Sequence, residues 1–250
     1  MNRGDYYNRD IAFLTAWNTP VQIAYNFNVS LRHKYIYCQT PKAACSTVKR
    51  FLILNEGYCE LPFETATAKY DQLDMLHMRD FSPLLNPKQL YPFKARLGDP
   101  DFFKFCFVRN PYSRVLSAYL DKVVHNRDQV KQVKAVLGRT MYPATKISFA
   151  DFVRVVVETP IGLMDTHWKN QYHHLCADVI NYDFIGKFEN IDSDLAEVAR
   201  RAGLDIGLYR DYSPHRSHAS DLTDKYYTKT LRDMVYKKFQ ADFETFGYEK

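Results

Sequence analysis

Two short apolar runs, each followed by a loop and then by a helical pattern, constrain the fold of this chain more than any other feature. The runs cover residues 34–39 and 102–108. Nearly continuous apolar character without strict alternation is typical of strands that are covered on both faces. A third run, residues 180–188, precedes another helical pattern, which Gly203 ends. The repeated strand–loop–helix order predicts an α/β fold with a central parallel sheet flanked by helices.

Two helices carry recognisable signals. Asn110 is suited to cap a helix, and Pro111 is suited to its first position, where a missing N–H has no cost. Residues 223–246 place Leu231, Val235 and Phe239 at fourfold spacing. That spacing predicts one C-terminal amphipathic helix, packed on the sheet.

Length and charge limit the classes of protein that fit. The chain has 250 residues, which is enough for one α/β domain and too few for two enzyme domains with separate cores. We therefore expect a single domain over residues 1–250. The net charge of +5 is spread along the sequence without a basic block. This pattern argues against nucleic-acid binding and favours an anionic ligand.

Cysteine usage and hydropathy bear on metal binding and location. The five cysteines form no C-x-x-C pair, so reduced thiols are expected. His173, His174 and Cys176 lie close in sequence, but no second spaced pair completes a tetrahedral set, and no metal site is predicted. The sequence has no run of 18 or more apolar residues, and residues 1–7 are polar where a signal peptide is apolar. We expect a cytoplasmic chain, with a truncated Golgi lumenal domain as the alternative.

The loop after the first run, residues 40–49, combines small residues with one early lysine. Small side chains let backbone N–H groups approach a phosphate, and the N-terminus of the following helix adds partial positive charge. The loop contains no glycine and has its lysine at the wrong end for a Walker A motif. By itself it fits an anion cradle and an ordinary strand-to-helix turn equally well.

Several segments resemble the sulfotransferase family. Pro41-Lys42 followed by small residues and Ser46-Thr47 resembles the 5'-phosphosulfate loop, and residues 109–119 (RNPYSRVLSAY) resemble the 3'-phosphate site. His167-Trp168 and residues 182–189 (YDFIGKFE) are similar to segments of carbohydrate sulfotransferases of the chondroitin, dermatan and heparan 2-O type. The resemblance runs from Tyr35 to about Glu189. It implies a three-layer P-loop-like sulfotransferase fold and transfer of a sulfuryl group from 3'-phosphoadenosine 5'-phosphosulfate (PAPS), which leaves 3'-phosphoadenosine 5'-phosphate (PAP).

The resemblance also implies residue roles in binding this donor. Lys42 is assigned to the bridging oxygen of the leaving 5'-phosphate, where negative charge grows during transfer. Arg109 and Ser117 are assigned to the 3'-phosphate, and Arg216, in a late basic loop, could add to it. Arg114 is expected as a surface or sheet-edge charge. Cys45 departs from the family pattern without expected loss, because the backbone binds the phosphate there. The predicted 5'-phosphate loop consists of Pro41, Lys42, Ala43, Ala44, Cys45, Ser46 and Thr47.

An acceptor hydroxyl needs a base, and histidine has the ordinary pKa that suits the task near neutrality. We predict His77, which lies between the two donor motifs in a region where related enzymes place a histidine near the acceptor. His167 is the alternative base, and Glu64 and His125 are more distant ones.

The predicted acceptor is a carbohydrate hydroxyl, with a glycolipid or small alcohol as alternatives and peripheral membrane association if the acceptor is a lipid. Two other functions stay open at this point. A P-loop-like phosphotransferase or NTPase would share the strand–loop–helix cradle but would need a magnesium site. A noncatalytic protein that binds anionic glycans would fit the charge of +5 but would not explain two separate phosphate motifs.

Overall fold

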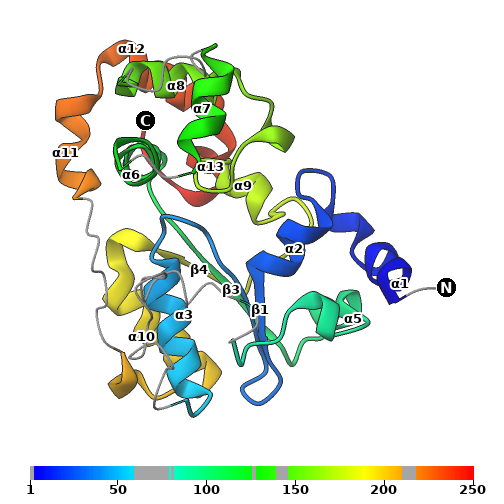
Figure 1. Cartoon of the computed structure of the whole chain (residues 1–250). Coiled ribbons are helices and arrows are strands. Elements are labelled where there is room, and N and C mark those ends of the chain that lie inside the picture. Colours follow the sequence, from blue (N-terminus) through cyan, green and yellow to red (C-terminus); the bar gives the residue numbers. More distant parts are fainter. Residues whose placement is uncertain (1–2, 59–78, 80–81, 126–127, 139–145, 210–217) are drawn as a thin grey trace, which may run out of the picture. The chain divides into compact units, whose positions relative to one another are not determined.

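A computed structural model describes residues 3–58, 79, 82–125, 128–138, 146–209 and 218–250 (Figure 1). The chain forms two compact units. Unit 1 comprises residues 1–40, 44–108 and 175–214, and unit 2 comprises residues 41–43, 109–174 and 215–250. Because each unit draws on several segments, no single cut in the sequence separates them. The single domain over residues 1–250 stays a prediction.

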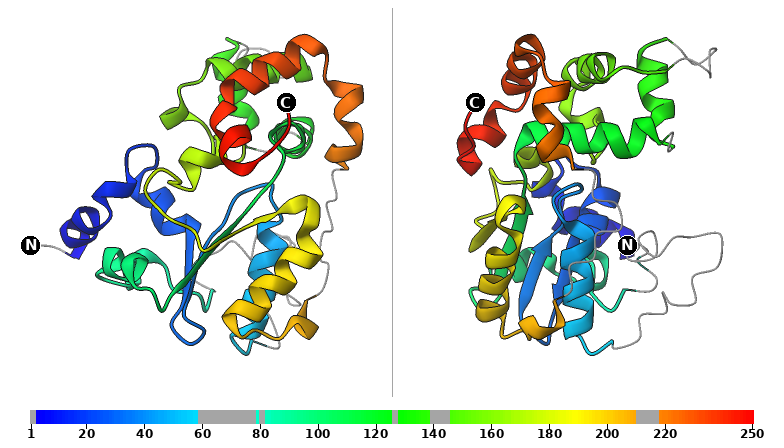
Figure 2. Two further views of the ribbon diagram at one scale, coloured as in Figure 1. Left: turned by 180° about the vertical axis from the view of Figure 1, so that it is seen from behind. Right: turned by 90° about the vertical axis from the view of Figure 1, so that its left-hand side faces the viewer.

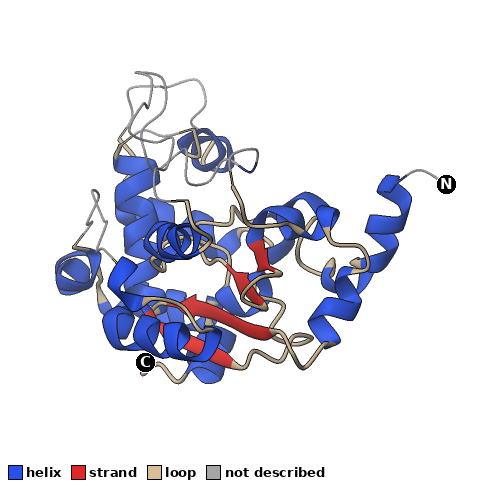
Figure 3. Ribbon diagram, turned by 90° about the horizontal axis from the view of Figure 1, so that it is seen from below, coloured by secondary structure: helices blue, strands red, loops and turns tan. Residues whose placement is uncertain are grey.

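Unit 1 contains a four-stranded sheet, shown in red in Figure 3. Its strands are β1 (Phe27–Ser30), β2 (Tyr35–Cys38), β3 (Phe103–Val108) and β4 (Phe184–Lys187), in the order β1-β2-β3-β4. β2, β3 and β4 run parallel, and β1 is antiparallel to β2. The three apolar runs are thus confirmed as parallel strands, the third shorter than predicted. The antiparallel edge strand β1 was not predicted.

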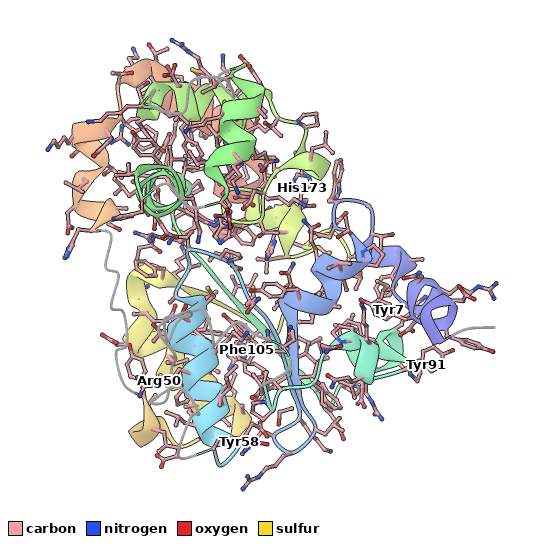
Figure 4. All side chains as sticks on the ribbon, viewed as in Figure 1. Tyr7, Arg50, Tyr58, Tyr91, Phe105 and His173 are labelled. Carbon is pink, nitrogen blue, oxygen red and sulfur yellow. The ribbon has the colours of Figure 1, made fainter. Side chains whose placement is uncertain are left out.

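One face of the sheet is covered by α3 (Cys45–Asn55) and α10 (Ile191–Ala202), which lie side by side in the views of Figure 2. Tyr35, Tyr37, Phe105 and Phe107 alternate along β2 and β3, so they point to this face. Phe105 is labelled in Figure 4. The helices meet these rings through apolar side chains that include Val48, Phe51, Leu52, Leu195, Val198 and Ala199.

The opposite face of the sheet is also covered, as the apolar runs predicted. Phe27, at the start of β1, packs edge-on against Phe93 of α5 (Phe93–Gly98), with ring centroids 5.2 Å apart. The N-terminal helices α1 (Arg3–Asp10) and α2 (Pro20–Asn26) belong to the same unit. Short 3₁₀ turns complete it: η1 (Ala12–Leu14), η4 (Pro87–Gln89), η7 (Phe188–Asn190) and η8 (Ile206–Leu208).

Unit 2 is helical in the part of the chain that is described. The predicted helix from Pro111 is present as α6 (Pro111–Ala118), and the side chain of Asn110 accepts a hydrogen bond from the Tyr112 amide (2.9 Å). α6 continues into a π-helical turn, η5 (Tyr119–Val124). The other elements before residue 175 are α7 (Val130–Val136), α8 (Phe149–Glu158), η6 (Ile161–Leu163) and α9 (Gln171–His174).

The C-terminal segment departs from prediction. Instead of one helix over residues 223–246, it forms α11 (Ala219–Tyr226), α12 (Lys229–Lys238) and α13 (Gln240–Phe246). Thr228 caps a new helix, since its hydroxyl accepts from the Leu231 amide. Leu231, Val235 and Phe239 are buried as expected, but their core includes side chains of α6 and α8 rather than of the sheet. The expected packing on the sheet was therefore wrong.

Candidate active site

The loop that leads into α3 has a strained backbone. Lys42 and Ala44 both adopt left-handed conformations, with φ of 70° and 58°. Each costs about 1–2 kcal/mol for a residue other than glycine. Backbone of this kind turns successive N–H groups to one side, which forms an anion-binding concavity. Ala44 is the N-cap of α3 and offers no side-chain acceptor to the first turn. This local geometry suits an anion cradle.

The ammonium group of Lys42 lies in unit 2, where it pairs with Asp121. Lys42 Nζ is 3.0 Å from Asp121 Oδ2, and Lys122 Nζ is 3.1 Å from the same oxygen. Burial raises the pKa of Asp121, but the two lysines outweigh burial and hold its pKa well below the usual range. Asp121 is therefore an anion that fixes two cations.

Asp121 and Lys122 both belong to the π-helical turn η5. Such turns are rare and occur frequently at functional sites. Asp121 was not predicted, because a lone acidic residue after a helical motif gives no sign of a partner 79 residues earlier in the chain.

Arg109 is buried, with only 5% of its surface exposed, and its position is fixed on both sides. Its backbone N–H donates to Gln171 Oε1 and its carbonyl accepts from Gln171 Nε2, both at 2.8 Å. Its guanidinium donates to Ser113 Oγ (3.0 Å), to the Lys42 carbonyl (3.2 Å) and to Ser220 Oγ (3.2 Å). Lys42 and Arg109, the two cations of the predicted donor site, thus belong to one cluster of residues in unit 2.

Serines of α6 and α11 contact the Arg109 guanidinium. Ser117, predicted for the 3'-phosphate, is buried on α6. Ser113, one turn earlier, supplies the hydroxyl that Arg109 contacts. Ser220, on α11, is a further partner, which no sequence motif indicated.

The location predicted for Arg114 needs correction. Arg114 is only 1% exposed, so the expected surface or sheet-edge location was wrong. Its guanidinium donates to the carbonyls of Pro41 (3.0 Å), Lys169 (2.7 Å) and Thr166 (3.0 Å). Because a guanidinium has five donors in a rigid plane, it can satisfy three backbone acceptors at once while it is buried. Arg114 thereby holds the residue before Lys42 and the segment that contains His167.

His167 has the surroundings of a general base. Its Nδ1 is 2.6 Å from Asp165 Oδ1, which also accepts from the His167 amide (2.9 Å). Burial lowers the pKa of His167, and although Asp165 opposes this effect, Lys122 and Lys42 add to it. The net direction favours the neutral imidazole, which can accept a proton. Asp165 fixes the tautomer, so Nε2 is the accepting nitrogen.

The remaining predicted residues divide into two groups. Ala44 caps α3 in unit 1, and Cys45, Ser46 and Thr47 form its first turn, where Cys45 is partly exposed. The predicted base His77, the alternative Glu64 and the predicted nucleotide-closing Arg216 lie outside the described residues.

The protein is thus α/β, with a mostly parallel sheet, a strand–loop–helix turn whose backbone suits an anion, and a buried arginine. The family model described as "Sulfotransferase family" matches residues 25–249, and the chain belongs to this family. This match confirms the predicted fold class.

The relatives are carbohydrate sulfotransferases. The chain is 28% identical to carbohydrate sulfotransferase 12 of Mus musculus, over 88% of this chain and 59% of the relative. It is 29% identical to carbohydrate sulfotransferase 14 of Homo sapiens, over 93% and 63%, and 30% identical to carbohydrate sulfotransferase 14 of Danio rerio, over 88% and 61%. The chain therefore spans about three fifths of the length of these relatives. Within the described residues, no helix is long and apolar enough to cross a bilayer.

Proposed function

We propose that this chain transfers a sulfuryl group from PAPS to a hydroxyl of a carbohydrate. The observation that carries the proposal is the contact between the two donor motifs. Arg109 Nη1 donates to the Lys42 carbonyl at 3.2 Å, although 67 residues separate them in sequence. In the family resemblance, these residues serve the two ends of one nucleotide.

Lys42 is assigned to the leaving group. As the acceptor oxygen bonds to sulfur, the bond between sulfur and the 5'-phosphate oxygen breaks, and negative charge grows on that phosphate. A loose transition state of this kind is accelerated mainly by positioning and by charge stabilisation. Lys42 is proposed to supply the cation for this phosphate. Asp121 orients the ammonium group of Lys42, since Asp121 Oδ2 lies 3.0 Å from Lys42 Nζ. Asp121 is thus a positioning residue for Lys42.

The proton of the acceptor hydroxyl goes to a base. Among the described histidines, His167 combines a carboxylate partner, a lowered pKa and electrostatic interaction with Lys42. These three features support His167 as the base, with Asp165 as the residue that orients it. His77 stays a prediction from the sequence.

The 3'-phosphate is assigned to Arg109, with Ser117 and Arg216 as predicted partners. Burial of Arg109 and its contacts to Ser113 and Ser220 keep its planar group oriented. A guanidinium that is fixed in this way can bind phosphate with two parallel hydrogen bonds. This second site would distinguish PAPS from ATP or ADP.

The names of the relatives support a carbohydrate acceptor. The sequence resemblance points to a hydroxyl of a polysaccharide or a glycoside. Glycolipids and small alcohols belong in the same acceptor screen.

The donor assignment is tested by nucleotide binding. At 100 times its dissociation constant, a ligand stabilises the folded state by about 2.7 kcal/mol, enough for a clear shift in melting temperature. We expect PAP to raise the melting temperature far more than AMP at equal concentration, because only PAP has the 3'-phosphate. Equal shifts from both nucleotides would contradict the roles of Arg109 and Ser117.

A further inference from the structure

Lys49 is a buried lysine without a hydrogen-bond partner among the described residues. Its exposed fraction is 0%, and Nζ makes no hydrogen bond within that part of the chain. Its ammonium lies 6.0 Å from the centroid of the Tyr25 ring. Fully buried lysines are almost always paired, so Lys49 calls for an explanation.

Arg79 is a second cation at the same tyrosine. Its guanidinium carbon is 5.8 Å from the centroid of the Tyr25 ring. It donates to Asn28 Oδ1 (2.9 Å), to the Phe27 carbonyl (2.6 Å) and to the Tyr25 carbonyl. These acceptors hold two of its nitrogens, while its Nε is buried and makes no hydrogen bond with any described residue.

No neutralising partner of Lys49 or Arg79 lies among the described residues. Burial lowers the pKa of Lys49 to about 7, and Arg79 contributes to that shift. Burial likewise lowers the pKa of Arg79 to about 10. In the described part of the chain, no carboxylate pairs with either group. Burying two positive charges away from water costs free energy unless an anion pairs with them.

The position of Lys49 connects this pair to the donor loop. Lys49 lies one turn after Cys45 in α3, and side chains of a helix lean toward its N-terminus. The ammonium therefore extends toward the turn where the resemblance places the 5'-phosphosulfate. Phe27, whose carbonyl holds Arg79, pairs with Cys38 at the carboxyl end of β2. Ligands of open α/β sheets bind outside this end of the strands.

We propose that Lys49 and Arg79 form a subsite for one anionic group of the acceptor, either the carboxylate or an ester sulfate of an acidic carbohydrate. Lys49 Nζ and Arg79 Nε are the two donors that such a group would satisfy. The inference rests on the proposed function, in which Lys42, residues 43–47 and Arg109 already serve the phosphates of the donor. Because those residues account for the phosphates of the donor, we assign the anion that Lys49 and Arg79 would bind to the acceptor.

The test measures binding rather than transfer. Wild-type protein saturated with PAP is titrated with a sulfated hexosamine–uronic acid oligosaccharide, with its carboxyl-reduced form and with its desulfated form. We expect the acidic oligosaccharide to bind about tenfold or more tightly than the form that lacks the recognised group. The reduced and desulfated arms show whether that group is the carboxylate or the sulfate.

Lys49→Met should reduce this preference to within about twofold, because it removes the charge and keeps an unbranched apolar chain. Lys34→Met is the matched control. It removes the same charge from a side chain in unit 1 that is 57% exposed, so it should keep the preference. The PAP-induced melting shift should stay the same in both variants. If Lys49→Met does not fold, Lys49→Gln is measured in its place.

Three results would overturn the subsite. One is an unchanged preference in the Lys49 variant, and another is an equal loss in both variants, which would indicate general electrostatic attraction. The third is loss of the PAP shift in the Lys49 variant, which would assign Lys49 to the donor. A wild-type protein that binds the acidic oligosaccharide with the expected preference but transfers no sulfate would contradict the proposed function and leave the subsite standing.

Discussion

The carboxylate of Asp121 organises the cations at the site. One of its oxygens lies about equally far from Lys42 Nζ and Lys122 Nζ, at 3.0 and 3.1 Å. Only Lys42 belongs to the loop that resembles the phosphosulfate motif. The two lysines therefore share a partner but differ in predicted function, so the effects of substituting each can be compared directly.

Lys42→Ala should lower turnover by about 100-fold or more and leave much of the nucleotide affinity, because the charge acts on the developing leaving group. Lys122→Ala is the control, and we expect a change of only a few fold. Turnover and PAP affinity are measured for both. Activity of Lys42→Ala within a few fold of wild type would remove this lysine from the mechanism.

His167→Ala should lower turnover by about 100- to 10,000-fold if the imidazole takes the acceptor proton. Because the pKa of His167 lies below its ordinary 6.5, wild-type activity should fall only as the pH drops through that lower value, where the base becomes protonated. The variant should lack this acid limb. Melting temperature and turnover are measured on the same preparation.

His77→Ala is compared in the same assay. Loss of transfer in a stable His77→Ala protein, with His167→Ala active, would return the role of base to His77. A drop in melting temperature with normal activity per folded molecule would assign either histidine a structural role.

At the scale of elements, α9 and α13 fix the strand-to-helix turn that carries Arg109. Asp242 of α13 accepts from the amides of Gln171 (2.8 Å) and Tyr172 (2.9 Å), and Gln171 in turn holds the backbone of Arg109. Burial raises the pKa of Asp242 to about 6, despite these hydrogen bonds. A chain of contacts thus links the C-terminal helix to the predicted 3'-phosphate residue.

The raised pKa of Asp242 predicts a pH dependence of stability. Between pH 3.8 and about 6 the folded state binds more protons than the unfolded state, so the free energy of unfolding falls as the pH rises through this window. Titration of Asp242 alone lowers the free energy of unfolding by about 3 kcal/mol across this window, since each pKa unit corresponds to about 1.4 kcal/mol.

Asp242→Asn should remove this slope, because asparagine does not titrate. Near pH 4 it should cost about 1–3 kcal/mol, since its NH2 group would face a backbone N–H. This difference from wild type should shrink as the pH rises through about 6, because only the wild type loses stability there. Denaturant unfolding of both proteins at pH 4, 5, 6 and 7 provides the comparison. Parallel pH profiles would show that Asp242 is not the titrating group.

The elements that the sequence predicted are those with strong local signals. Continuous apolar runs identified β2 and β3, and Asn110-Pro111 marked the start of α6. β1 lacks such a signal, because its Asn28 is buried through hydrogen bonds that only the folded chain provides, to the carbonyls of Asn26 (3.0 Å) and Tyr37 (3.5 Å). Apolar spacing continues through residues 223–246, so the capping by Thr228 that divides this segment was missed.

The site was predictable where a motif lies in one stretch of sequence. Lys42 and Arg109 follow from their own loops. No local sequence pattern predicts the partners that come from distant segments, namely Asp121, Ser220 and the carbonyl groups that Arg114 contacts. Burial of Arg114 and Lys49 could not be predicted either, since both follow from packing that covers otherwise ordinary basic residues.

At the scale of the whole molecule, the predicted functions divide between the two units. Unit 2 contains Lys42, Arg109 and His167, and unit 1 contains the N-terminal turn of α3 with Lys49. The chain passes between the units at the predicted donor loop, after Thr40 and again after Ala43.

Mass-resolved transfer from PAPS tests the central claim most directly. Purified chain is incubated with PAPS and a panel of carbohydrate, lipid and phenol acceptors, with and without EDTA, and both products are quantified. We predict that a carbohydrate gains one sulfuryl group for each PAP released, at the same rate in EDTA, and that Lys42→Ala slows this reaction by about 100-fold or more. Phosphoryl transfer that EDTA abolishes, or a folded protein that binds PAP and sulfates no carbohydrate, would contradict the account.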